Sequence, residues 1–95
     1  YPDLDQATAI VRARVPMASA DLATGVAEAV QRLRGLEVQK PPGIAEAIDW
    51  VQAAALLGLV SLDESGVERT LSSVLKYRED QELARAEGLA WVAGQ

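Results

Sequence analysis

The sequence contains no cysteine, no histidine and no phenylalanine. Without cysteine and histidine the chain cannot form disulfides, thiolate–zinc sites, cysteine nucleophiles or a histidine-dependent catalytic triad. Long apolar runs are also missing, because the longest, residues 53–60, is far shorter than the roughly 20 residues that a membrane helix needs. These absences exclude most catalytic and metal-binding classes, and we expect no membrane partner.

Positive charge is scarce as well. Nine Lys and Arg stand against 14 Asp and Glu, which gives a net charge of −5 and a pI near 4.6. Such a chain is a poor nucleic-acid binder, since neutralising phosphates needs a basic face. The first five residues are acidic where a secretory signal would be positive, so we expect a cytoplasmic protein with no nucleic-acid partner.

What the chain does contain is helix-forming composition. Hydrophobic residues make up 49% of its 95 residues although aromatics make up only 4%, so alanine and leucine dominate. This length supports one domain with a single core. Because the chain begins with Tyr1 rather than Met, we expect residues 1–95 to be a piece of a longer protein.

Apolar residues recur at three-to-four-residue spacing in five segments, and no segment alternates as a strand would. The predicted helices cover residues 3–14, 19–35, 43–58, 63–78 and 79–92. The last is weak and is interrupted by Gly88, where it can bend, fray or run on from the fourth. The predicted fold is therefore all-α, a compact bundle of four helices plus a weaker fifth. The predicted core residues are Leu22, Val26, Val30, Ile44, Ile48, Val51, Val67, Leu71 and Leu75.

Two features of this pattern make sharper predictions. Residues 43–58 carry apolar side chains over about half the helix circumference, which predicts the central helix, so Ile48→Ala is expected to cost about 2–5 kcal/mol. In the fourth helix, Asp63 is the expected N-cap, with Leu62 and Val67 forming a hydrophobic staple.

Few residues are candidates for chemistry. The serine and threonine hydroxyls have no histidine to activate them, and we predict no catalytic residue and no metal site. Adjacent carboxylates lie at helix ends, where we expect them to be solvated rather than paired for catalysis. These carboxylates are Asp3 with Asp5, Asp63 with Glu64, and Glu79 with Asp80.

The strongest candidate site is the segment Lys40-Pro41-Pro42-Gly43-Ile44-Ala45-Glu46. A rigid Pro-Pro followed by glycine at a helix start leaves free backbone N–H groups that attract anions, and Lys40 adds a positive charge. The predicted binding residues are Lys40, Pro42, Gly43, Ile44 and Ala45. The alternative is that Pro-Pro-Gly only positions a core helix, since every helix has such an N-terminus.

Two further segments have alternative interpretations. Lys76-Tyr77-Arg78 is either a docking face or a helix end with cations placed on the helix dipole, and we favour the helix end. Trp91 either closes the core or contacts a partner. We favour core closure, because the chain has few other large side chains.

Several short blocks, taken in order, resemble a known family. They are Tyr1-Pro2-Asp3, Val15-Pro16, Leu33-Arg34, Lys40-Pro41-Pro42-Gly43-Ile44-Ala45-Glu46, Ile48-Asp49-Trp50 and Leu75-Lys76-Tyr77-Arg78-Glu79-Asp80. Together they resemble the C-terminal helical lid of MoxR-type AAA+ ATPases, the branch that works with von Willebrand A-domain proteins. The resemblance covers residues 1–82 and is most specific between Pro41 and Trp50; residues 83–95 lie outside it.

The resemblance implies a parent ATPase whose N-terminal domain holds ATP with Mg²⁺. The lid would close over the nucleotide and contact neighbouring subunits of a ring. The ring would remodel or activate protein complexes, with a von Willebrand A-domain protein as a partner. Residues 1–3 would be the hinge. Related lids carry a phosphate-sensing arginine where this chain has Ala45, so either Lys40 or Arg34 replaces it or the branch lacks that contact.

A second class of function stays open beside this one. The chain can instead be an independent acidic helical module that binds proteins and has no nucleotide role. In either case we expect the isolated 95-residue chain to bind no ATP and to hydrolyse none, because it carries no P-loop.

Overall fold

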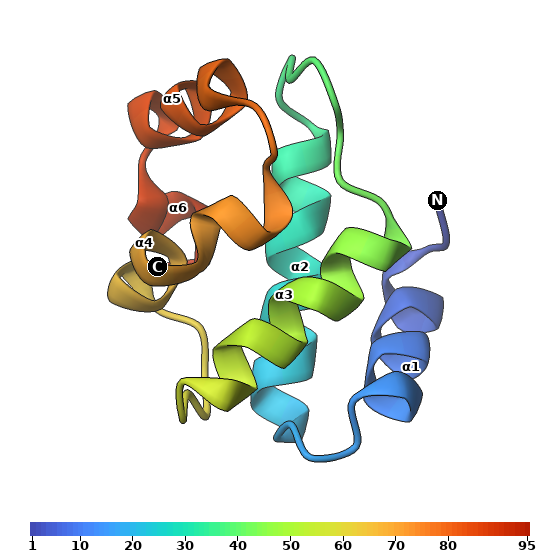
Figure 1. The fold of residues 1–95 in the computed structure, drawn as a ribbon. Coiled ribbons are helices and arrows are strands. Elements are labelled where there is room, and N and C mark those ends of the chain that lie inside the picture. Colours follow the sequence, from blue (N-terminus) through green and yellow to red (C-terminus); the bar gives the residue numbers. More distant parts are fainter.

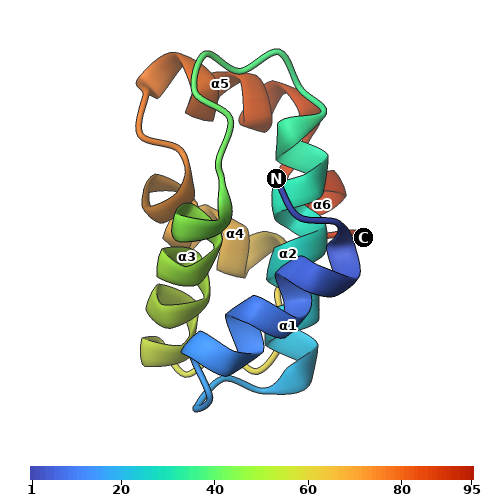
Figure 2. The same ribbon diagram turned by 90° about the vertical axis from the view of Figure 1, so that its right-hand side faces the viewer.

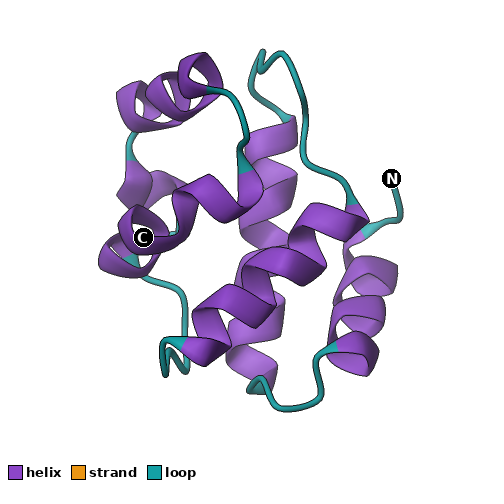
Figure 3. Ribbon diagram, in the orientation of Figure 1, coloured by secondary structure: helices purple, strands orange, loops and turns teal.

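The computed structural model describes residues 1–95 as an all-helical domain, which confirms the predicted class (Figure 3). The expected fifth helix is two helices, so the chain has six. None of them is both long enough and apolar enough to cross a lipid bilayer. The helices are α1 (Leu4–Arg14), α2 (Ala20–Arg34), α3 (Ile44–Leu56), α4 (Glu64–Val74), α5 (Arg78–Glu87) and α6 (Leu89–Val92).

Helix α2 runs through the middle of the molecule, and α1, α3 and α6 pack against it (Figures 1 and 2). Helix α3 crosses α2 on one side, and α1 packs against both. Helix α4 packs on α3, while the short α6 fills the space between α4 and α2, and α5 packs on α6. The result measures 32 × 26 × 21 Å.

Helix α3 packs against α1, α2 and α4, as expected of a helix covered from more than one side. Helix α2 buries seven side chains along its length, whereas α3 buries four, namely Ala47, Trp50, Val51 and Ala54. Two predicted core residues, Ile44 and Ile48, are only half-buried and pack against the edge of the core. The reason is that Trp50, the largest buried side chain, is fully buried. The buried face of α3 is therefore centred on Ala47, Trp50 and Ala54 rather than on Ile44 and Ile48. The other predicted core residues are buried.

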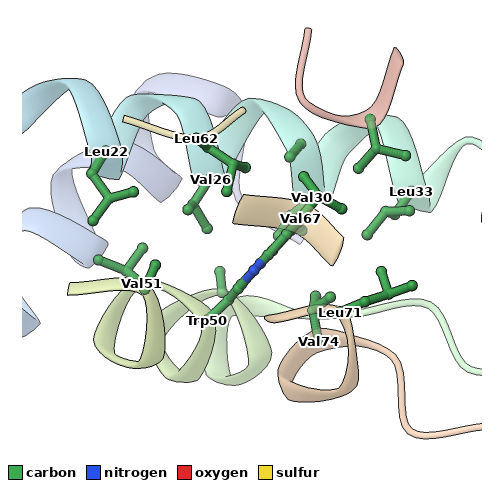
Figure 4. Close-up of a cluster of buried hydrophobic side chains, with 14 of the residues drawn as sticks. Leu22, Val26, Val30, Leu33, Trp50, Val51, Leu62, Val67, Leu71 and Val74 are labelled. Carbon is green, nitrogen blue, oxygen red and sulfur yellow. The ribbon is translucent and has the colours of Figure 1, made fainter. Parts of the chain in front are cut away.

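One polar pair lies inside this core and involves Trp50, whose side chain Figure 4 shows among the apolar ones. The Trp50 indole N–H donates to the Thr70 hydroxyl at 2.6 Å, and that hydroxyl donates to the Gly66 carbonyl at 2.6 Å. The chain leaves no buried side-chain polar atom without a partner. The pair joins α3 to α4 in the centre of the domain.

Helix α4 starts as predicted but ends earlier. The Asp63 carboxylate accepts from Gly66 N at 2.7 Å, which confirms the cap. The two residues of the predicted staple, Leu62 and Val67, are both buried in the core. The helix stops at Val74 because Leu75 is extended and buried, so the predicted end at residue 78 is wrong.

The residues after Leu75 therefore have different roles from those predicted. Lys76 Nζ donates to the Ser73 carbonyl at 3.1 Å, close to the end of α4, as expected for a cation there. Arg78 instead opens α5, at the positive end of that helix dipole, so its predicted place at a helix C-terminus is wrong. Tyr77 is the N-cap of α5 and is exposed.

The C-terminal residues 83–95 complete the core. Ala84, Leu89 and Val92 are buried, and Gly88 breaks the helix at a φ of +112°, where glycine is favoured. Trp91 is 40% exposed, so the prediction that it closes the core is wrong. Leu89 and Val92 occupy the buried positions of α6 instead.

Candidate functional site

The predicted site is the loop between α2 and α3, together with the first turn of α3. Two apolar side chains anchor the loop, since Val38 is buried and Leu36 is half-buried. Pro42 is buried as well, whereas Lys40 and Pro41 are exposed. The stiff Pro-Pro pair thus approaches α3 with one ring packed inward and the other facing solvent.

The start of α3 presents the expected backbone donors. Gly43 is the N-cap in extended conformation, and the first helical bond runs from Ala47 N to the Gly43 carbonyl at 3.0 Å. The N–H groups of the three residues between them have no intrahelical acceptor. Ala45 is exposed, so an anion can approach this turn without meeting a bulky side chain.

A carboxylate lies at the same helix start, which was not predicted. Glu46 Oε1 accepts a hydrogen bond from Gly43 N at 2.8 Å. This bond caps the helix, but it also places a negative charge beside the donors, where it opposes a phosphate group. A glutamate at the third helical position is the known signature of a capping box, so the sequence held this signal.

Of the two cations considered as replacements for the missing arginine, Arg34 contacts the loop. Its Nη1 donates to the Pro42 carbonyl at 2.8 Å, and its guanidinium stacks over the Tyr1 ring with the carbon 4.4 Å from the ring centroid. Partial burial raises the pKa of the Tyr1 hydroxyl, and the Arg34 charge opposes part of that rise. The Lys40 side chain is exposed and forms no ion pair.

The other end of the loop is held by Asp80, which was predicted to be solvated and is 2% exposed. Its two carboxylate oxygens accept from Gln39 N at 2.8 Å and from Lys40 N at 3.0 Å. The prediction was wrong because it treated Asp80 only as one of two adjacent carboxylates at a solvated helix end. In a helix that starts at Arg78, Asp80 and the buried Ala84 are four residues apart on one face.

The structure thus gathers residues from distant parts of the chain around one loop. Tyr1, Arg34, the segment 39–43 and Asp80 all meet there, whereas Tyr77 and Arg78 remain exposed and form no bond with the loop. The surface there has no enclosed pocket, and no three metal-ligating side chains lie close enough to hold an ion. Chemically the arrangement offers the free backbone N–H groups of the first turn of α3, with the Glu46 carboxylate beside them.

Comparison with known proteins gives no further assignment: no protein family, no curated protein and no solved structure matches this chain.

Proposed function

We propose that the domain is the C-terminal lid of a MoxR-type AAA+ ATPase that acts in the cytoplasm. In this function the lid follows a nucleotide-binding domain, and the start of α3, from Pro42 to Ala45, faces the phosphates of Mg·ATP. The lid also contacts neighbouring subunits of a ring that remodels protein complexes, with a von Willebrand A-domain protein as a partner. The isolated domain performs no catalysis.

One observation carries this proposal. The blocks on which the family resemblance rests are far apart in the sequence, yet two of them contact the loop between α2 and α3, and a third contacts one of those two. Arg34 binds the Pro42 carbonyl, Asp80 binds the Gln39 and Lys40 amides, and Tyr1 stacks on Arg34. A resemblance that arose by chance in unrelated surface segments would not be expected to converge on one helix start.

The sequence upstream of Tyr1 gives the first test. A Gly-rich strand–loop–helix with Lys and Ser or Thr in the parent reading frame supports the proposal, because that motif cradles the ATP phosphates. A stop codon followed by a new start just before Tyr1 overturns it.

Binding measurements on the parent chain give the second test. Ala45→Arg restores the arginine of related lids and is expected to tighten ATP binding by about 1.5–3 kcal/mol, roughly tenfold or more. Glu46→Gln removes the opposing charge while keeping a cap, and is expected to act in the same direction. Ala13→Arg adds the same charge at an exposed site on α1 and serves as the matched control. Unchanged ATP affinity and turnover in folded Ala45→Arg would refute the placement of this helix start.

The alternative function is an acidic protein-binding module without a nucleotide role. Exposed apolar side chains near the α1–α2 and α3–α4 connections favour it. Leu56 is 72% exposed, Val60 is 71% exposed and Met17 is 63% exposed. The Ser19 hydroxyl donates to the Val60 carbonyl at 2.6 Å, which brings the α1–α2 and α3–α4 connections together at that end (Figure 1). Exposed apolar side chains on neighbouring connections are typical of protein interfaces. If Leu56→Glu abolishes partner binding while Ala45→Arg leaves nucleotide affinity unchanged, the alternative is preferred.

A further inference from the structure

The loop between α2 and α3 has almost no backbone support of its own. No backbone–backbone hydrogen bond involves residues 37–42. Proline has no N–H, so Pro41 and Pro42 cannot donate one. The amides of Gln39 and Lys40 both donate to the single carboxylate of Asp80. The path of this loop therefore depends on a side chain from another helix, 40 or more positions away in the chain.

The link from that carboxylate to the start of α3 is short and stiff. Only the two prolines separate Lys40 from Gly43, and proline fixes the backbone φ angle near −65°. On the far side of the prolines, Arg34 holds the Pro42 carbonyl. The orientation of the first turn of α3 is thus set between two contacts, one from α5 and one from α2.

We infer that Asp80 is the positioning residue of the nucleotide-facing helix start, an inference that rests on the proposed function. Asp80 touches no ligand itself. It fixes the Lys40 amide, and through the two prolines it sets where the free N–H groups of α3 point. A buried carboxylate bound to two consecutive amides suits this task, because each oxygen accepts one N–H and neither bond can turn independently.

Asp80→Asn is the variant that tests this. Asparagine has nearly the same shape but only one carbonyl oxygen, so its NH₂ group faces one of the two amide donors. The matched control is Glu79→Gln, which makes the same charge change at the neighbouring exposed position of α5 without touching the loop. Asp80→Glu keeps both acceptor oxygens and the charge, and is expected to restore part of the function.

The first measurement is amide hydrogen exchange by NMR on the 95-residue chain, which involves no nucleotide. In Asp80→Asn the Gln39 and Lys40 amides are expected to exchange roughly tenfold faster or more, while core amides of α2 keep their protection. Glu79→Gln is expected to leave both amides unchanged. Unchanged exchange of both amides in Asp80→Asn overturns the inference, whatever the nucleotide measurements show.

The second measurement is the Kd for Mg·ATP of the parent chain. Asp80→Asn is expected to weaken binding roughly tenfold, with kcat at saturating ATP much less affected and with Glu79→Gln unchanged. If Ala45→Arg changes ATP affinity but Asp80→Asn does not, the proposed function stands and the positioning role is wrong. If neither variant changes it, the proposed function fails, and Asp80 orders the loop for another reason.

Discussion

Trp50 on α3 and Thr70 on α4 form a hydrogen bond between buried side chains, 2.6 Å from the indole nitrogen to the hydroxyl oxygen. Both residues are almost fully buried, and the surrounding side chains are apolar (Figure 4). The indole N–H has no other partner there. The threonine hydroxyl is therefore what permits the largest side chain of the core to be buried completely.

Thr70→Val tests this relationship. The substitution keeps the shape but leaves the indole N–H buried and unpaired, and it is expected to lower the free energy of unfolding by about 1–3 kcal/mol. Thr70→Ser keeps the hydroxyl and is expected to lose less. Urea denaturation of the three proteins measures the difference, and equal stability of Thr70→Val and wild type would contradict the role of the bond.

The second prediction concerns the position of the core. Leu71 is 2% exposed, and Leu71→Ala is expected to cost about 2–5 kcal/mol, because it leaves a cavity. Ile48 is half-buried, so Ile48→Ala is expected to cost less than about 2 kcal/mol, below the range that its helical pattern predicts. Denaturant unfolding of both variants decides the order. A greater loss for Ile48→Ala than for Leu71→Ala would contradict the placement of Ile48 at the edge of the core.

The third prediction concerns residues 83–95, which lie outside the family resemblance. Leu89 and Val92 are each expected to contribute about 1.5–3 kcal/mol through burial, a large share of the 5–15 kcal/mol typical of small domains. A chain ending at residue 82 is therefore expected to lose cooperative thermal unfolding. A chain ending at Ala93 retains both side chains and is the control, and a cooperative transition in both would show that α6 is dispensable.

The fourth prediction concerns the phenol of Tyr1. Because burial raises its pKa, the folded state keeps this proton at pH values where the unfolded chain has lost it. Any stability from this group is fully present below the unfolded pKa of about 10 and falls as the pH rises through the folded pKa. In a Tyr77→Phe background, absorbance of the remaining tyrosinate is expected to appear above pH 10.

Replacing Arg34 tests the cause of this shift. Arg34→Met keeps a long apolar side chain over the ring but removes the positive charge, so the Tyr1 pKa is expected to rise further. The same absorbance titration measures it. A lower pKa in Arg34→Met than in wild type would show that Arg34 acts by burying the ring rather than by its charge.

The fifth prediction is the lack of nucleotide activity in the isolated chain. Phosphoryl transfer needs a P-loop, Mg²⁺ and a charge-stabilising arginine around the phosphates, and the sequence contains no P-loop. The net charge of −5 also repels a polyanion. Calorimetric titration with Mg·ATP is expected to give no binding heat, and turnover that persists through repurification would contradict this.

Local patterns determined the parts of this protein that depend on neighbouring residues. The three-to-four-residue apolar spacing predicts the helices, and the Asp63 cap is correct because its hydrogen bond joins residues only three positions apart.

The tertiary structure alone decided the contacts between distant residues. Asp80 is buried because its carboxylate accepts hydrogen bonds from the Gln39 and Lys40 amides of the loop between α2 and α3. The sequence of α5 alone does not indicate this contact. Trp50 turns inward because Thr70, 20 positions later, supplies an acceptor, and that turn moves Ile44 and Ile48 to the edge of the core. Periodicity shows that a helix has an apolar face, but which part of that face is buried depends on the partners that the rest of the chain brings to it.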